Sequence, residues 1–382
     1  MRLSDCHNVA DFRRLAQKRL PAPIFHYIDG AADDEITKRR NSSAFDDCDL
    51  VPNILAGVAE IDMSATVMGR KINLPLMLSP TALQRLFHWQ GERAVARTAQ
   101  DLGTWFGISS LATVSIEEIG AAIASPKMFQ LYIHKDKGLN AAMIQRCKAA
   151  KFDCIALTVD TVVAGNRERC QRTGFTSPPR FTPASVMSYA MHPAWTCNYL
   201  FREKFALPNL ETHVDAGTNV AVSVAEYFNS MLDPSIDWKM AEKIRRDWGG
   251  EFCLKGVMSA DDARRAVDIG ATAIMVSNHG GRQLDGSRSP FDQISEIADA
   301  VGGQIDIICD GGIRRGTHVL KALAAGATAC SGGRLYLYAL AAAGEAGVRR
   351  ITGKLRDEIE RDMKLMGVTR IEQLRRGHLR WR

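Results

Sequence analysis

The sequence predicts an α/β fold in which eight parallel strands close into a barrel surrounded by helices, the (β/α)8 or TIM barrel. Eight short apolar runs recur along the chain, and amphipathic helical stretches follow most of them. Polar side chains and glycines gather where nearly every run ends, and in a barrel these strand ends share one rim. An open doubly wound sheet is the alternative, but the chain lacks the Gly-x-Gly-x-x-Gly turn that usually follows its first strand.

The expected strands are short and apolar, and the expected helices repeat apolar residues every three or four positions. The strands are predicted over residues 74–79, 104–109, 128–132, 154–159, 252–255, 273–277, 305–310 and 328–331. The helices are predicted over residues 91–102, 116–124, 139–150, 237–248, 259–269, 291–301 and 316–325. Cysteines inside the apolar runs, such as Cys154 and Cys253, are expected to be small core residues.

The whole chain, residues 1–382, is predicted to be one domain. Its parts are an N-terminal helical cap (1–70), the barrel (71–350) with a long loop insertion after the fourth strand (161–250), and a C-terminal helical tail (351–382). Helices are expected in the cap over residues 9–20, 23–28 and 33–41, the first ending at Pro21 because proline interrupts a helix.

The insertion interrupts the alternation of strands and helices. It contains several prolines, among them Pro178 and Pro179, and aromatic residues such as Trp195 and Tyr199. Its first half also carries more arginine and lysine than glutamate. Loops of this length are usually functional, and two interpretations stay open: a lid over the site, or a surface that contacts an anionic membrane.

Composition excludes several classes of protein. The formal charge of +6 over 382 residues, with no basic stripe that carries aromatics, gives no reason to expect nucleic-acid binding. No apolar run is long enough to span a membrane, and the N-terminus lacks the layout of a signal peptide. The nine cysteines form no Cys-x-x-Cys pair, so we expect no metal site and a reducing, cytoplasmic location.

The most informative segment is residues 272–286, where an apolar run ends in Ser-Asn-His-Gly-Gly-Arg-Gln-Leu-Asp-Gly. His279 can take a proton near neutral pH, and Arg282 can clamp a carboxylate at two points. The fourth strand ends at Asp160, which would face His279 across the rim and stabilise a protonated imidazole. Asp285 would be a partner of Arg282. The alternative is an ordinary strand-end loop in which the histidine caps a backbone group.

Other strand ends carry positive charge and glycine. The segments Asp310-Gly-Gly-Ile-Arg-Arg-Gly316 and Gly332-Gly-Arg334 resemble loops that bind phosphate through backbone N–H groups, with plain turn glycines as the alternative. Lys255 ends the fifth strand. It is either a Schiff-base nucleophile, as in a phosphate-binding lyase, a fixed positive charge beside a cofactor, or a structural lysine.

Together these motifs resemble the FMN-dependent 2-hydroxy acid oxidase and dehydrogenase family, which includes glycolate oxidase, L-lactate dehydrogenases and mandelate dehydrogenase. The matching segments are Pro80-Thr-Ala82, Phe129-Gln-Leu-Tyr132, Leu157-Thr-Val-Asp-Thr161, Leu254-Lys-Gly256, Ser277-Asn-His-Gly-Gly-Arg-Gln-Leu-Asp285 and Asp310-Gly-Gly-Ile-Arg-Arg-Gly316. The likeness covers nearly the whole chain.

The resemblance implies a role for each site residue. FMN would be contacted by Thr81, Ala82, Ser109, Gln130, Thr158, Lys255, Ser277, Asp310, Gly312, Arg314, Gly333 and Arg334. The substrate would be surrounded by Tyr27, Tyr132, Arg167, His279 and Arg282, with His279 as the base and Asp160 behind it. Lys255 would support negative charge on the reduced flavin.

The resemblance also implies the reaction: oxidation of an L-2-hydroxy acid, L-lactate first, with electrons passed to a quinone or a cytochrome. An oxygen-using oxidase, or a member acting on a larger aryl or modified-peptide substrate, is the alternative, because Leu111 stands where glycolate oxidase-like members place a tryptophan. Val162 and Asn166 also depart from the family pattern. The insertion resembles that of quinone-linked lactate dehydrogenases, which implies peripheral contact with the inner face of the cell membrane. Relatives suggest a homotetramer.

Overall fold

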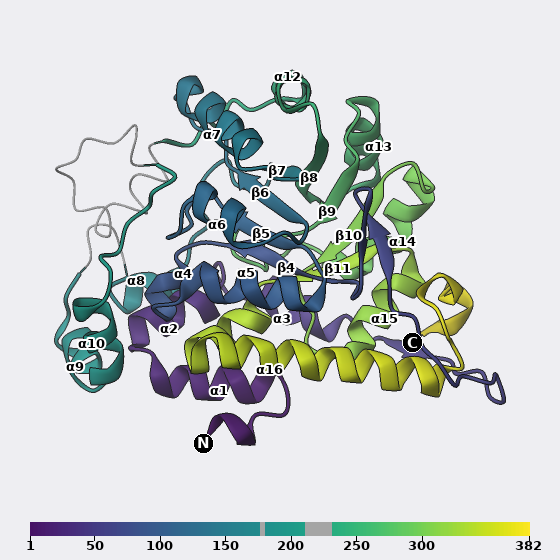
Figure 1. The fold of residues 1–382 in the computed structure, drawn as a ribbon, viewed down its shortest axis with the longest axis horizontal. Coiled ribbons are helices and arrows are strands. Elements are labelled where there is room, and N and C mark those ends of the chain that lie inside the picture. Colours follow the sequence, from purple (N-terminus) through teal and green to yellow (C-terminus); the bar gives the residue numbers. More distant parts are fainter. Residues whose placement is uncertain (176–179, 211–230) are drawn as a thin grey trace.

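In a computed structural model, which describes residues 1–175, 180–210 and 231–382, eight parallel strands form a closed barrel (Figure 1). The strands are β4 (Leu76–Thr81), β5 (Phe106–Ser109), β6 (Lys127–Leu131), β7 (Cys154–Thr158), β8 (Glu251–Val257), β9 (Ala273–Val276), β10 (Asp306–Asp310) and β11 (Ala329–Gly332). They pair in this order, and β11 closes the ring on β4. The predicted TIM barrel is therefore confirmed, with every expected strand present.

The helices that cover the barrel lie outside the strands, and several of them begin at a side chain that caps them. They are α5 (Gly91–Leu102), α6 (Ile116–Ala122), α7 (Lys137–Ala149), α12 (Trp238–Trp248), α13 (Ala260–Asp268), α14 (Pro290–Val301), α15 (Gly316–Ala325) and α16 (Arg334–Met366). Ser115, Ser259 and Ser289 each accept a hydrogen bond from a backbone N–H of the first turn, at α6, α13 and α14. Most of these helices bury an apolar face and leave the opposite face in solvent.

The strand residues divide between two apolar layers, as period-two alternation requires. In β7, Cys154 and Ala156 belong to one buried cluster, while Ile155 and Leu157 belong to the larger cluster that includes the helices. Val67 and Ile72 join the cluster of Cys154 from the hairpin of β2 (Ala65–Val67) and β3 (Arg70–Ile72). The cysteines predicted to be core residues are buried.

The N-terminal cap packs against the long C-terminal helix. Its helices α1 (Val9–Arg19), α2 (Ala22–Asp29) and α3 (Ile36–Ser43) match the prediction, and α1 lies along α16 (Figure 1). The fully buried Asp29 carboxylate binds Arg13 and Lys38 of the cap and Arg169 of the insertion. Because α2 reaches the barrel rim, the cap brings residues near position 27 to the strand ends.

The C-terminal end departs from a simple helical tail. Helix α16 continues through residue 350, with a break in helical geometry at Ala343 and Gly344. After α16, strand β12 (Leu379–Trp381) pairs antiparallel with β1 (Cys48–Leu50). This two-stranded sheet was not predicted, because its partners lie at opposite ends of the chain.

The insertion between β7 and β8 contains short helices that the sequence pattern did not predict. They are α8 (Glu168–Arg172), α9 (Pro183–Ala190) and α10 (Pro193–Phe201). Pro183 and Pro193 occupy first helical positions, where proline is favoured, and this signal was available in the sequence. Figure 1 shows α9 and α10 beside α2 and α4 (Gln84–Phe87), away from the barrel axis. Pro178 and Pro179 lie outside the described residues.

Among the residues that the structure describes, none of the helices is both long and apolar enough to cross a membrane.

Candidate active site

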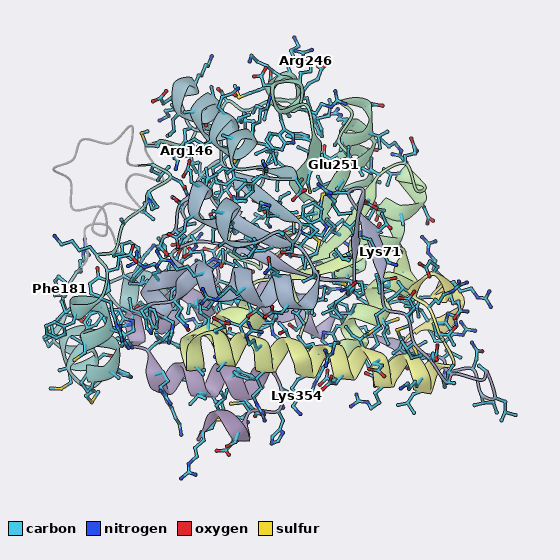
Figure 2. The ribbon with its side chains drawn as sticks, in the orientation of Figure 1. Lys71, Arg146, Phe181, Arg246, Glu251 and Lys354 are labelled. Carbon is cyan, nitrogen blue, oxygen red and sulfur yellow. The ribbon has the colours of Figure 1, made fainter. Side chains whose placement is uncertain are left out.

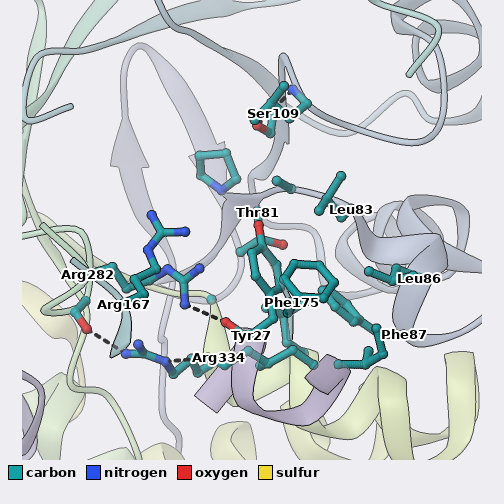
Figure 3. Close-up of a pocket in the computed structure, with 18 of the residues that line it drawn as sticks. Tyr27, Thr81, Leu83, Leu86, Phe87, Ser109, Arg167, Phe175, Arg282 and Arg334 are labelled. Atoms are coloured by element: carbon teal, nitrogen blue, oxygen red, sulfur yellow. Dashed lines mark hydrogen bonds between the residues drawn. The ribbon is translucent and has the colours of Figure 1, made fainter. Parts of the chain in front are cut away.

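A cavity of about 650 Å³ opens at the carboxyl ends of the barrel strands, beneath the cap and the insertion (Figure 3). Figure 3 shows its two sides: Arg167, Arg282 and Arg334 on one, and Leu83, Leu86 and Phe87 on the other. The predicted site residues that line it are Tyr27, Thr81, Ala82, Ser109, Gln130, Tyr132, Arg167, Lys255, His279, Arg282, Asp310, Gly312, Arg314, Gly333 and Arg334.

The remaining predicted residues lie directly behind this lining. Thr158 accepts a hydrogen bond of 2.6 Å from the side-chain amide of Gln130. Ser277 contacts Lys255 and Asp310, and Asp160 contacts His279. The structure therefore brings the whole predicted set to one place.

The hydrogen bonds around His279 fix which of its nitrogens faces the cavity. Nδ1 lies 3.0 Å from Oδ1 of Asp160, a carboxylate that can only accept, so Nδ1 carries the proton. The Thr161 hydroxyl donates to the same oxygen at 2.9 Å. Nε2 is then the unprotonated nitrogen, and the Tyr132 hydroxyl lies 3.4 Å from it. The arrangement presents the lone pair of Nε2 as a base.

Burial and neighbouring charges keep His279 and Tyr132 neutral and Asp160 charged. Burial lowers the pKa of His279 below its usual value of 6.5, although the Asp160 charge opposes the shift. Burial alone would raise the pKa of Asp160, but the His279 interaction outweighs it and keeps that pKa below its usual value. Burial raises the pKa of Tyr132 to about 12, so its phenol stays protonated.

Two arginines that line the cavity have N–H groups without a partner among the described residues. One terminal nitrogen of Arg282 donates to the carbonyl oxygens of Tyr27 and Gly30, at 2.6 and 3.1 Å. Within the ranges that the structure describes, Nε and the other terminal nitrogen then remain for a ligand. The buried Nε of Arg167 has no hydrogen-bond partner in the described part of the chain. Burial, with the repulsion from Arg282, lowers the pKa of Arg167 to about 10, so it stays charged. This pair is suited to holding a carboxylate.

Asp285 is not the partner of Arg282 that the sequence suggested. Its carboxylate accepts hydrogen bonds from the backbone N–H groups of Ile36 and Thr37, at 3.2 and 2.8 Å. Asp285 therefore fixes the start of helix α3 instead of contacting the cavity, since a carboxylate is favoured at a helix N-terminus.

Lys255 is held in a buried ion pair at the bottom of the cavity. Its Nζ lies 2.7 Å from Oδ2 of Asp310 and 2.9 Å from the Ser277 hydroxyl. Burial alone would lower the pKa of Lys255, but the Asp310 charge raises it above its usual value. A lysine that stays protonated is a poor Schiff-base nucleophile, so the geometry favours the fixed positive charge over the lyase alternative.

The residues at one end of the cavity fit a phosphate. Arg314 and Arg334 line it, and neither has a carboxylate partner within 4 Å among the described residues. Burial lowers the pKa of Arg334 to about 10. Gly311 has a φ of +107°, and a side chain there would extend into open space. The nitrogens of Arg334 donate to the carbonyl oxygens of Ile28, Gly280 and Gly30, which hold its charge at this end of the cavity. The charge, the glycine and the start of helix α16 match what the phosphate of FMN requires.

Several lining residues were missed at the sequence level. Phe87, Phe175, Tyr189, Trp195 and Tyr199 form an apolar arm of the cavity. They come from α4 and from the insertion, whose aromatic residues the lid interpretation placed over the site without naming any of them as a site residue. Tyr336 was also missed: its hydroxyl lies 2.8 Å from that of Thr81.

The fold and the site together define a barrel oxidoreductase that uses a flavin. A family model for FMN-dependent dehydrogenases matches residues 16–381, and the chain belongs to this FMN-dependent family. It is 40% identical over 368 residues to an L-lactate dehydrogenase of Alcaligenes faecalis, covering 95% of this chain and 96% of that protein. It is 37% identical over 377 residues to glycolate oxidase 1 of Oryza sativa subsp. indica, covering 99% and 96%.

Among solved structures, a monotopic membrane protein, (S)-mandelate dehydrogenase, superposes with a TM-score of 0.94 at 31% identity, covering 99% of this chain and 100% of that one. The relatives thus share oxidation of 2-hydroxy acids and differ in the acid named. The predicted family and cofactor are confirmed at this level.

Proposed function

We propose that this protein oxidises an L-2-hydroxy acid, L-lactate first, to the 2-oxo acid with FMN as the electron acceptor in the site. The observation that carries the proposal is the meeting of three features in one cavity. The features are the unprotonated Nε2 of His279, the free N–H groups of Arg167 and Arg282, and the charged Lys255.

In this proposal Arg167 and Arg282 hold the substrate carboxylate, and the phenol of Tyr132 donates to the substrate near Nε2 of His279. His279 accepts a proton from the hydroxy acid, and the buried Asp160 carboxylate stabilises the imidazolium that forms. Tyr27 orients Arg282, whose guanidinium carbon lies 4.9 Å from the centre of its ring. When bound, FMN supplies the acceptor for two electrons.

The chain's own charges favour that electron transfer. Lys255 stays protonated beside Asp310 and places a positive charge where negative charge develops. We assign the phosphate to Arg314, Arg334, Gly312 and Gly333. The remaining contacts to the ring system are assigned to Thr81, Ala82, Ser109, Gln130, Thr158, Ser277 and Asp310.

We propose a quinone as the acceptor that reoxidises the flavin, with the protein at the inner face of the cell membrane; a cytochrome or oxygen is the alternative. Support comes from the insertion, where large apolar side chains are exposed: Phe181, Val186, Met187, Met191, Leu200 and Phe201. Figure 2 shows Phe181 at the outer edge of the molecule, beside α9 and α10. Such a concentrated apolar surface is typical of membrane contact, and a structural neighbour is described as monotopic.

A larger aryl hydroxy acid is the second candidate substrate. Leu111, Phe87 and Phe175 line an apolar arm of the cavity that extends well beyond what the methyl group of lactate would fill. The similarity to (S)-mandelate dehydrogenase supports this candidate as well. The homotetramer expected from relatives stays a prediction, which light scattering of the purified protein would test.

Anaerobic mixing of the FMN-loaded protein with lactate, glycolate and mandelate tests the proposal. We expect the visible flavin absorption to disappear fastest with L-lactate; faster bleaching with mandelate would favour the aryl acid. Addition of a quinone analogue, cytochrome c or oxygen to the reduced protein then identifies the acceptor by the rate at which the absorption returns. A protein whose bound flavin is reduced by none of these acids would refute the proposed function.

A further inference from the structure

Thr81, at the end of β4, lines the cavity (Figure 3), and two buried side chains from elsewhere in the fold hold its hydroxyl. Tyr336, from α16, places its hydroxyl 2.8 Å from that of Thr81. The side-chain nitrogen of Gln84, from α4, lies 3.1 Å from the Thr81 hydroxyl and 3.3 Å from the Tyr336 hydroxyl. Tyr336 and Gln84 are both fully buried.

The hydrogen positions in the cluster of Thr81, Tyr336 and Gln84 follow from which partner atoms can donate a hydrogen bond and which can only accept one. The Tyr336 hydroxyl lies 2.6 Å from the backbone carbonyl oxygen of Ser79, which can only accept, so the one proton of Tyr336 is donated there. The short contact with Thr81 therefore needs the proton of Thr81, and Thr81 donates to Tyr336. Burial raises the pKa of Tyr336 well above its usual value, so its proton is retained.

The contacts of the Gln84 amide favour one orientation, in which its nitrogen has three acceptors and its buried oxygen has no hydrogen-bond partner among the described residues. Its nitrogen lies 3.4 Å from the backbone carbonyl oxygen of Thr81, a contact that would be repulsive if the amide oxygen stood there. Gln84 therefore donates to Thr81. The Thr81 hydroxyl then donates its proton to Tyr336 and accepts from Gln84, and these contacts leave its second lone pair unused.

We propose that Tyr336 and Gln84 are positioning residues that make the Thr81 hydroxyl an acceptor, and never a donor, toward the flavin. This inference rests on the proposed placement of FMN beside Thr81. Two-electron reduction adds N–H groups to an isoalloxazine ring, whereas the oxidised ring presents mainly acceptors. A group that only accepts hydrogen bonds therefore stabilises the reduced cofactor and raises its reduction potential.

The test measures the reduction potential of bound FMN by dithionite titration against reference dyes, which needs no hydroxy acid. Tyr336→Phe frees the Thr81 proton to turn toward the cavity. We expect the reduction equilibrium to move toward the oxidised form by up to about tenfold, the value of one hydrogen bond, which corresponds to about 30 mV for a two-electron couple. Tyr338→Phe is the matched control: on the same helix, its buried hydroxyl donates to Asp29 at 2.8 Å, and the potential should not change.

A double-mutant cycle with Thr81→Val shows whether Tyr336 acts through Thr81. Thr81→Val should lower the potential, and Tyr336→Phe should add nothing in that background. A potential unchanged in Tyr336→Phe, or an effect that persists beside Thr81→Val, would overturn the inference.

If Tyr336→Phe does not fold, the reduction potentials of the variants Thr81→Ser and Thr81→Val test the inference instead. The inference is supported if Thr81→Ser keeps the reduction potential of the wild type and Thr81→Val lowers it. Equal potentials in the two variants refute it. A wild-type protein that binds no FMN refutes the proposed function together with this inference. A wild-type protein that binds FMN and oxidises hydroxy acids, with variants of equal potential, refutes this inference alone.

Discussion

Asp160 reaches His279 by crossing over the strand that separates them. Asp160 follows β7 and His279 follows β9, while β8 lies between these strands in the barrel. At the crossing point β8 has Gly256, with a φ of +115°, and a β-carbon there would lie 2.6 Å from the β-carbon of Asp160. The missing side chain of Gly256 is what lets Nδ1 of His279 and Oδ1 of Asp160 approach to 3.0 Å.

Gly256→Ala should therefore disrupt the pair without touching either residue. The new methyl group displaces Asp160, and the positive φ adds strain of about 1–3 kcal/mol. Since a shift of about 1 Å in a catalytic group can cost roughly a hundredfold, we expect a loss of that order in the rate of flavin reduction, measured by stopped flow. Gly353→Ala, on α16 with open space around it, is the control and should behave as wild type.

His279→Gln removes the base and keeps a side chain that can contact Asp160. We expect flavin reduction by L-lactate to slow by roughly 100- to 10,000-fold, with FMN still bound, because general base catalysis is typically worth this much. Single-turnover absorbance and an FMN titration give the two readouts. His7→Gln, at an exposed position near the N-terminus, should change neither. A rate within a few fold of wild type would mean that another group is the base.

The pH dependence of flavin reduction should reflect the lowered pKa of His279. His279 must be neutral to act as the base, and burial lowers its pKa below 6.5. As the pH is lowered, the rate should therefore still be at its maximum at pH 6.5 and should begin to fall only at a more acidic pH. Asp160→Asn removes a charge that raises this pKa, so the acid limb should move to still lower pH while the plateau falls by roughly a hundredfold. An acid limb that moves to higher pH in this variant would contradict the assignment.

Arg282→Lys should weaken substrate binding more than it slows the chemical step. One terminal nitrogen of Arg282 already donates to two carbonyl oxygens. A lysine ammonium that made the same two bonds would have a single N–H group left, which cannot hold a carboxylate at two points. We expect the dissociation constant for L-lactate to rise about tenfold or more, read from the concentration dependence of flavin bleaching. Arg264→Lys, whose arginine pairs with Asp261 on α13, provides the control. Unchanged affinity in Arg282→Lys would exclude the carboxylate clamp.

Replacing exposed apolar residues of α10 should abolish membrane binding. Leu200 and Phe201 are 64% and 81% exposed, and burying each in lipid is worth about 1.5–3 kcal/mol. The double variant Leu200→Glu, Phe201→Glu should lose at least about a hundredfold in affinity for phosphatidylglycerol–phosphatidylethanolamine vesicles in a flotation assay. Leu365→Glu changes a leucine of similar exposure on α16 and should bind as wild type. Equal flotation of both variants would exclude α10 as the contact.

Much of the fold could be predicted because its signals are local. Each barrel strand is an apolar run, and the chemistry of the rim stands within a few residues of the strand end, as at Asp160, His279 and Asp310. The pairing of Cys48 with Trp381 could not be predicted, because nothing near either residue specifies a partner at the other end of the chain. For the same reason Asp285 was placed with its neighbour Arg282, whereas it binds the distant start of α3.

The sequence by itself determined the barrel, the family and the kinds of side chain that meet at the rim, since strand, helix and motif signals all act over short stretches. Only the tertiary structure decided how those side chains face one another. Distances between segments far apart in the chain decide three features of the site. They let Asp160 cross over Gly256, leave N–H groups of Arg282 for a ligand, and set the partner to which Thr81 donates its proton. Such distances follow from the packing of whole elements, which no local pattern records.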